Sequence, residues 1–495
     1  MTKIIKNTVY LNGNVIISTL VTLYTIRVLL NTLGDLEYGL LNLISGVVAF
    51  LSFLNGSMAI STQRNLTFCL QKTKKEFSIV FSNSLFIHLI MATLIGIVCF
   101  ILKGYLIGDL LTIPEGKIDE ANILYIVTVL TMCITIISVP YESILSAYEK
   151  FWLVSWLNII ASIARLLAAL YISNIESNRL VYYALLTLLI SFIVALYKYY
   201  YCKVKYEGLN FKIRLINFSC SINLLKFVGW NTFGALCGVV RIQGLGILIN
   251  MFFSLTINAA YAIAIQVNSK LKELSLSVTR AFNPKIVRSE SIGDREAMLG
   301  LSLDSSRLSL YLFSFLAIPL IINLEYVFDL WLISYPKEAK TFVVLFVVLS
   351  LVNLTTIGLQ TAIQAFGDIK LYQITIGSIL LFTLPIAYFL LKYEYPYYSI
   401  LVVSIILEII SCILRLVLLK VKTGLNIRLY IIGIFKVLGV ILTSYLLSAS
   451  LLNILFASSL LGAVLMSLLA IFLNVCLGYL FLLTPEQKKS LKNIC

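Results

Sequence analysis

Long apolar runs alternate with short polar segments over almost the whole chain, from Val9 to Leu483. Each run has about 20 residues, which is the length that an α-helix needs to cross the hydrocarbon core of a membrane. The pattern predicts an all-α polytopic membrane protein with about fourteen transmembrane helices, because no polar segment is long enough to fold as a separate domain. The expected helices occupy approximately residues 8–31, 38–60, 78–102, 122–145, 153–172, 181–201, 227–250, 258–279, 307–332, 341–363, 371–391, 399–419, 429–451 and 457–483.

A weak internal repeat relates the first six expected helices to the next six. Matching residues lie 218 or 219 positions apart: Asn12 and Asn231, Asn31 and Asn250, Ala147 and Ala365, Lys203 and Lys422. Repeats displaced by an even number of membrane crossings have the same orientation, which predicts two parallel six-helix lobes around a central cavity. The expected lobes are residues 1–205 and 206–422, and residues 423–495 add two peripheral helices and a tail.

Composition supports the membrane assignment. Hydrophobic residues make up 60% of the 495 residues and charged residues only 12%, with a mean hydropathy of +0.98. A soluble domain uses roughly 25% charged residues, so this chain cannot cover a soluble surface. The net charge of +15 does not require nucleic acid. Most Lys and Arg residues fall in segments that are cytoplasmic if the N-terminus is cytoplasmic, and the positive-inside rule then predicts that both termini are cytoplasmic.

Motifs for catalysis and metal binding are absent from the sequence. The nine cysteines form no CxxC pair, and His88 is the only histidine. The sequence contains no P-loop, HExxH or GxSxG motif. One acidic motif, Asp35-Leu36-Glu37, lies in a short expected turn, where solvation of the turn explains it better than catalysis does. We therefore expect a protein that is not an enzyme and that has no catalytic residues, bound metal or cofactor.

Charged residues inside the expected helices indicate a binding site, because a charge at mid-membrane is costly unless it faces water or a partner. Asn158 and Arg165 lie on one polar stripe of the fifth expected helix, and Asn231 and Arg241 lie on one stripe of the seventh. Small and polar residues alone would indicate only helix packing. The arginines favour a cationic, water-filled lumen, and Arg27 in the first helix either lines it or extends to the membrane surface.

Two further helices carry both acids and bases. Gln266, Lys270 and Glu273 share one face of the eighth expected helix, where the lysine and the glutamate are one turn apart and can neutralise each other. Lys272 points away from this face, and we expect it to extend to the membrane surface. In the twelfth helix, Glu408 and Arg415 share a face but are two turns apart, about 10.5 Å, which we expect to be too far for direct pairing within the helix.

The residue types of the expected lumen constrain its ligand. A guanidinium group offers a planar fork of donors that suits phosphate or carboxylate. Asn, Gln and Ser side chains suit hydroxyl-rich groups such as sugars. A lipid-linked anionic saccharide fits both properties if the cavity opens sideways to admit its tail.

Three segments resemble polysaccharide flippases, the O-antigen and capsule translocases of the multidrug/oligosaccharidyl-lipid/polysaccharide (MOP) exporter superfamily. The N-terminal block TLYTIRVLLNTLGDLEYGLLNLISGVVAFLSFLNGSMAISTQRNLTF carries most of the resemblance. VPYESILSAYEKF (Val139–Phe151) and AIQVNSKLKELSLSVTRAFNPKIVRS (Ala264–Ser289) follow in the expected order. Lys270, Lys272 and Glu273 depart from the resemblance, because we expect a more neutral eighth helix in that family.

The resemblance implies a fourteen-helix, two-lobed flippase in the bacterial inner membrane. Its cargo would be an undecaprenyl-pyrophosphate-linked oligosaccharide, the repeat unit of O-antigen, capsule or exopolysaccharide. Such a protein works by alternating access, with Arg165 and Arg241 among the lumen residues. Polymerase and chain-length proteins of the same pathway would be its partners, together with the lipid bilayer. Coupling to a proton or sodium gradient through Glu273 or Glu408 and consumption of the product on the far side are alternative driving forces.

Two other functions remain as alternatives. A MATE-like exporter of cationic drugs shares the expected fold, but such a cavity usually needs acidic residues, and bases outnumber acids here. A polysaccharide polymerase or membrane glycosyltransferase would need a large external catalytic loop. The longest expected external loop, residues 103–121, is too short for that role.

Overall fold

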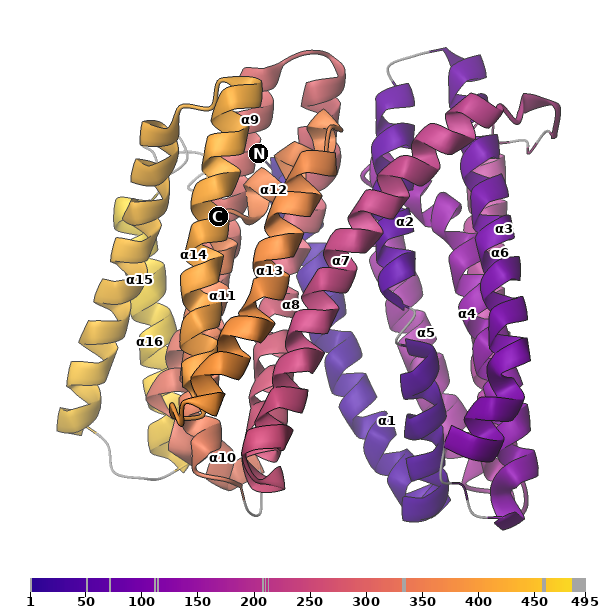
Figure 1. Cartoon of the computed structure of the whole chain (residues 1–495), viewed down its shortest axis with the longest axis horizontal. Helices are drawn as coiled ribbons and strands as arrows, with labels where there is room; N and C mark the ends of the chain where they lie inside the picture. The colour runs from indigo at the N-terminus through magenta and orange to yellow at the C-terminus, as the bar shows by residue number, and fades with distance from the viewer. Residues whose placement is uncertain are drawn as a thin grey trace. The chain divides into compact units, whose positions relative to one another are not determined.

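The computed structural model describes residues 2–482, except for 50–51, 71–72, 111–112, 114, 207–208, 210, 212, 332–334 and 456–459. Over these residues the chain forms α-helices joined by short turns and contains no strand, which confirms the expected all-α class (Figure 1). The basic residues of the tail, Lys488, Lys489 and Lys492, lie outside the described residues. The chain divides into two compact units, Met1–Ala235 and Leu236–Cys495.

The first unit contains six long helices and the first half of a seventh. They are α1 (Thr2–Ala49), α2 (Ser52–Cys69), α3 (Lys74–Tyr105), α4 (Ile118–Ala147), α5 (Phe151–Ile172), α6 (Arg179–Lys205) and the start of α7 (Phe218–Phe252). A kink divides α1 at Gly34, whose φ of 72° favours glycine because other residues would bring Cβ close to the backbone. The kink falls in the turn that the sequence predicts between the first two helices.

The second unit contains the rest of α7 and nine further helices. They are α8 (Leu255–Ser291), α9 (Arg295–Ile322), α10 (Leu324–Trp331), α11 (Glu338–Leu354), α12 (Ile357–Phe366), α13 (Lys370–Lys392), α14 (Ser399–Thr423), α15 (Ile427–Leu455) and α16 (Leu460–Phe481). The helices α11 and α12 meet at a bend of 41° around Thr355 and Thr356. Together they form the single span expected at residues 341–363.

Within the described residues, eleven helices are long and apolar enough to cross a membrane, or twelve if α11 and α12 form one bent span. These twelve correspond to twelve of the fourteen expected spans. The span expected at 38–60 is divided between α1 and α2, and the span expected at 258–279 lies within α8. The described residues of both segments are helical, but α8 carries Lys270 and Lys272 together with Asn, Gln and Ser residues, so it contains no window apolar enough to count as a span.

Several helix pairs of the second unit pack as their counterparts in the first unit do. Helix α4 packs on α2, α3 and α6, and the bent pair α11–α12 packs on α8, α9 and α14 in the same way. Likewise, α5 packs on α6 and α13 packs on α14. Ala147 ends α4 and Ala365 lies near the end of α12, while Lys203 and Lys422 lie in the last turns of α6 and α14. These two matched pairs therefore occupy equivalent places in the two units.

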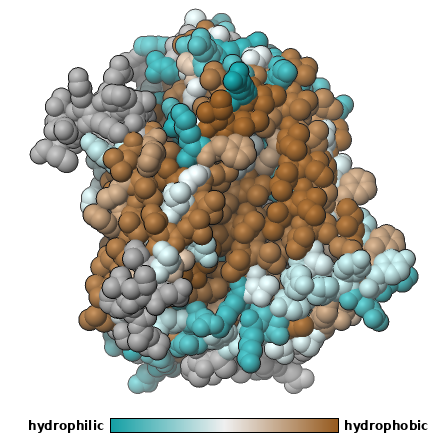
Figure 2. Space-filling view, turned by 90° about the vertical axis from the view of Figure 1, so that its left-hand side faces the viewer, coloured by the Kyte–Doolittle hydropathy of each residue, from teal (hydrophilic) through white to brown (hydrophobic). Residues whose placement is uncertain are grey.

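Large apolar side chains cover the outside of the long helices. Phe100 and Ile101 on α3 and Phe435 and Phe472 on α15 and α16 are mostly exposed. Figure 2 shows one face of the molecule, on which hydrophobic residues form a broad band between hydrophilic ends. Lipid chains are the solvent that suits such a surface, so the exposed residues fit a multi-pass membrane protein.

Hydrogen bonds attach α15 and α16 to α9, and the bond to α15 joins the hydroxyl groups of Ser306 and Tyr430 at 2.8 Å. The Tyr311 hydroxyl donates to the backbone carbonyl of Asn474 over 2.7 Å. The side-chain amide of Asn474 donates to the Ser314 hydroxyl over 2.7 Å. Gly478 allows this close approach, because a Cβ there would lie 1.9 Å from the Tyr311 hydroxyl. The two helices outside the repeat are thus packed into the second unit through specific polar contacts.

We expect Asn474→Ala to destabilise the second unit, because it removes the buried side-chain amide that donates to Ser314 on α9 and accepts from Ser444 on α15. The expected loss is about 1–3 kcal/mol of unfolding free energy, seen as a lower midpoint in thermal unfolding of the purified protein in detergent. Ser450→Ala is the matched control, since Ser450 is exposed and bonds to Leu447 of its own helix. Equal midpoints for Asn474→Ala and the wild type would contradict the assignment.

Candidate functional site

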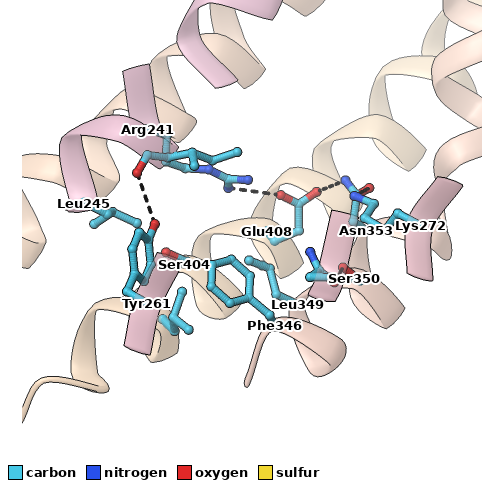
Figure 3. A pocket seen from close by; sticks show the side chains of 13 residues that line it. Arg241, Leu245, Tyr261, Lys272, Phe346, Leu349, Ser350, Asn353, Ser404 and Glu408 are labelled. Atoms are coloured by element: carbon cyan, nitrogen blue, oxygen red, sulfur yellow. Dashed lines mark hydrogen bonds and ion pairs between the residues drawn. The ribbon is translucent and has the colours of Figure 1, made fainter. Parts of the chain in front are cut away.

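A polar pocket lies among four helices of the second unit, α7, α8, α11 and α14 (Figure 3). The cavity has a volume of about 70 Å³, which is room for about two water molecules. One side is apolar and the other carries charged and amide groups. The lining residues are Arg241, Ile242, Leu245, Tyr261, Asn268, Lys272, Phe346, Leu349, Ser350, Asn353, Leu401, Ser404 and Glu408.

Glu408 is at the centre of the polar side, and its side chain is only 1% exposed. One carboxylate oxygen, Oε2, lies 3.4 Å from the Arg241 guanidinium on α7. The other oxygen, Oε1, accepts hydrogen bonds from the Asn353 amide at 2.8 Å and from the Arg415 guanidinium at 3.1 Å. A buried carboxylate needs such donors, because it has lost its hydration.

The pairing of Glu408 with Arg415 corrects the expectation that the two are too far apart to meet within one helix. Their separation of two turns describes the backbone, whereas side chains on a helix lean toward its N-terminus. The long Arg415 side chain extends back along α14 and reaches the carboxylate. Arg415 also donates to the Thr356 hydroxyl at 2.9 Å, at the bend between α11 and α12.

Lys272 also differs from expectation. It does point away from the face of Lys270, but it does not extend to the membrane surface. Its ammonium group lines the pocket and donates to the side-chain carbonyl oxygen of Asn353, Oδ1, over 3.1 Å. Asn353 therefore connects Lys272 on one side to Glu408 on the other (Figure 3).

We call Arg241, Lys272, Asn353, Glu408 and Arg415 the Glu408 cluster. Three of its members carry positive charge at neutral pH and one carries negative charge, so the cluster has an excess of positive charge. Burying charges costs free energy unless each is paired or hydrated. Arg415 is 5% exposed and pairs with Glu408, whereas Arg241 is 14% exposed and borders the cavity. The excess charge therefore faces the pocket.

The other predicted site residues of the second unit lie outside this pocket. Lys270 and Glu273 form the expected ion pair at 3.2 Å on α8, where the lysine side chain is 65% exposed. Gln266 on the same helix is also exposed. Of the predicted residues, the pocket thus brings together Arg241 and Glu408.

In the first unit, the predicted cations are exposed. Arg27 on α1 and Arg165 on α5 both have exposed side chains, and Asn158 is half-buried on the same face of α5 as Arg165. Asn231, in the part of α7 that belongs to the first unit, is buried and donates to the Phe227 carbonyl at 3.0 Å. The side chain of Asn231 is therefore hydrogen-bonded to the backbone of its own helix.

Lys117 forms an ion pair with Glu37 of the acidic motif Asp35-Leu36-Glu37 and a second one with Glu120. Its ammonium group lies 2.7 Å from both Glu37 and Glu120. The ammonium group donates hydrogen bonds to the side chains of Glu120 and Glu37, and these bonds raise the pKa of Lys117 above its usual value. Glu37 thus joins α1 to the start of α4 through a salt bridge, which is a structural role.

Three members of the cluster were not among the predicted site residues. Arg415 lies on the polar stripe that the sequence predicts for α14, on the same face as Glu408. Lys272 was set aside because it faces away from Lys270. Asn353 is a single amide in an apolar helix, and the sequence offers no periodic pattern that would mark it.

No known protein-family model and no curated protein sequence matches the chain. Solved structures do share its fold. A MATE protein crystallised in complex with MaL6 superposes with a TM-score of 0.72 at 14% identity, over 85% of this chain and 96% of its own. A MOP-superfamily transporter from Pyrococcus furiosus gives a TM-score of 0.73 at 12% identity, over 85% and 95% of the two chains.

A third structure, an outward-facing multidrug resistance MATE family transporter, gives a TM-score of 0.73 at 13% identity, over 85% of this chain and 95% of its own. These matches establish that the chain has the two-lobed, all-helical fold of the MOP superfamily. At 12–14% identity the matches show the fold alone, and two of the three structures are described as transporters.

We expect Glu408→Ala to destabilise the protein strongly, because Arg415 would remain buried without its carboxylate. Breaking a buried ion pair costs about 3–5 kcal/mol, measured as a lower midpoint of thermal unfolding in detergent. Replacing both partners, as Glu408→Leu with Arg415→Leu, should restore part of the loss, because Arg415 no longer remains buried without its carboxylate, whereas Arg241 still loses its partner.

The matched control for this prediction is Glu325→Ala. It breaks the Lys340–Glu325 pair, in which the glutamate side chain is 79% exposed. An exposed pair contributes at most about 1 kcal/mol. A Glu408→Ala midpoint no lower than that of Glu325→Ala would show that the cluster does not stabilise the fold.

Proposed function

We propose that this protein is a membrane transporter that flips a lipid-linked anionic oligosaccharide, the undecaprenyl-pyrophosphate-linked repeat unit of a surface polysaccharide, across the bacterial inner membrane. The observation that carries this proposal is the excess positive charge of the Glu408 cluster, placed in a pocket of a transporter fold. Both termini would be cytoplasmic, in keeping with the positive-inside rule.

The chemistry of the pocket suits the two parts of such a cargo. Arg241 and Lys272 offer cationic donors for phosphate oxygens. Ser350 and Ser404 add hydroxyl groups, and Tyr261 and Phe346 form an apolar wall beside them. Arg27, Arg165 and Lys270, which are exposed on their helices, are proposed as additional cations on the path of the cargo. Binding and release suffice for this function, so no covalent step is required.

Coupling to an ion gradient, if the protein uses one, is better assigned to Glu273 than to Glu408. Both oxygens of Glu408 already accept from Arg241, Asn353 or Arg415, which leaves little room for a proton or sodium ion. Glu273 is 39% exposed and has a single lysine partner. Its carboxylate is therefore the more accessible of the two.

Export of cationic drugs is the second candidate function, and the observation that favours it is the fold of a multidrug resistance MATE transporter. Charge argues against it, because cations outnumber the carboxylate in the Glu408 cluster. Polarity can differ within this fold: the Pyrococcus furiosus transporter is described as having a reverse polarity of its binding pocket that suggests a different function.

We expect Arg241→Glu to abolish surface polysaccharide in a strain that carries the variant as its only copy of the gene. Charge reversal would repel the phosphate groups of the cargo and place a second carboxylate beside Glu408. Lys272→Gln should reduce the polysaccharide without abolishing it. The measurement is polysaccharide on intact cells, with membrane expression of each variant checked by blotting.

Lys340→Gln is the control, because it removes a lysine from an exposed ion pair of the second unit. Wild-type polysaccharide with well-expressed Arg241→Glu would defeat the proposed site. If deletion of the gene instead sensitises cells to cationic drugs and leaves the polysaccharide unchanged, drug export is the function.

A further inference from the structure

The three contacts of Glu408 are unequal. Its Oε1 atom holds Asn353 at 2.8 Å and Arg415 at 3.1 Å, whereas Oε2 lies 3.4 Å from Arg241. Arg241 is also the more exposed of the two arginines, at 14% against 5%. The contact with Arg241 is therefore the longest and the most accessible to a group in the cavity.

Glu408 would keep its closest partners if Arg241 turned away. Arg415 and Asn353 both donate to Oε1, so one positive charge and one neutral donor remain with the carboxylate. Arg241, in contrast, has no second carboxylate among the described residues within ion-pair distance. It would need another anion to replace Glu408, and the cavity at its side provides space for one.

We infer that Glu408 is an internal competitor for Arg241: it pairs with the guanidinium when the pocket is empty, and an anionic phosphate group of the cargo takes its place. This inference rests on the proposed function. Glu408 would then set the affinity of the pocket, because the cargo must first displace it. The apparent affinity falls in proportion to the fraction of time for which Arg241 is available.

Such competition suits a transporter. Two unopposed cations in a pocket of low polarity would hold a phosphate tightly, and release on the far side would be slow. The internal carboxylate offers Arg241 an alternative partner as the cargo leaves, so bound and empty states are closer in free energy. Glu408 does not compete with the cargo for Lys272, because the Lys272 ammonium donates to the side-chain carbonyl oxygen of Asn353.

A binding experiment with inorganic pyrophosphate tests this inference. The dissociation constant is measured by titration calorimetry with the purified full-length protein in detergent. We expect Glu408→Gln to bind pyrophosphate about tenfold more tightly than the wild type, which corresponds to about 1.4 kcal/mol. Arg241→Gln should bind more weakly, and so should Lys272→Gln. Opposite shifts from two members of one cluster are not expected from general destabilisation.

Double variants separate competition from the general effect of removing a negative charge. If Glu408 acts by occupying Arg241, Glu408→Gln should have no effect when Arg241→Gln is already present. It should still tighten binding about tenfold when Lys272→Gln is present. A gain of affinity that persists in the Arg241→Gln background would reflect the field of Glu408 alone and would overturn the inference.

The remaining outcomes distinguish the inference from the proposed function. If Arg241→Gln weakens pyrophosphate binding and Glu408→Gln leaves it unchanged or weakens it, the anion site stands and the competition is wrong. If the wild type does not bind pyrophosphate, or Arg241→Gln binds as the wild type does, the proposed site fails and the inference fails with it. Should Glu408→Gln not fold, the double replacement of Glu408 and Arg415 by leucine removes the competitor without leaving the Arg415 guanidinium buried and unpaired, and the same results apply to it.

Discussion

The buried carboxylate of Glu408 connects three helices of the second unit through ion pairs and a hydrogen bond. It lies on α14 and accepts from Arg241 on α7, Asn353 on α11 and Arg415 on its own helix. Cations at this depth are tolerated only when they are paired or hydrated. Glu408 supplies the pairing and the cavity supplies space for water, so both the packing of these helices and the presence of a cationic pocket depend on one side chain.

The same network reaches the bend between α11 and α12. Arg415 donates to Thr356, and the Tyr430 hydroxyl on α15 donates to the Thr355 carbonyl at 2.9 Å. The Gly358 amide donates to Ser306 on α9 at 2.9 Å. A Cβ on Gly358 would lie 1.9 Å from a backbone oxygen of α9, so the close packing requires glycine. Side chains from neighbouring helices thus satisfy the backbone at a break that lipid alone could not accommodate.

Much of the fold was predictable because membrane-spanning helices need only length and apolar composition. Of the site, periodicity placed Glu408 and Arg415 on one face of α14 and assigned Lys270 and Lys272 to different faces of α8. Both faces of α8 carry a lysine, however, and the periodicity does not predict which of the two faces packs against neighbouring helices. The structure places Lys272 against Asn353 and leaves Lys270 exposed beside Glu273.

The sequence by itself determined that the chain is an all-helical membrane protein with buried cations, because the cost of charge in lipid and the length of a span act on each helix separately. Which charges pair was decided by the tertiary structure. Asn353 and Arg241 are 55 and 167 residues from Glu408, and their meeting depends on how α7, α11 and α14 pack. Even the pair within α14 depended on the direction in which a long side chain leans, which the spacing of backbone positions does not give.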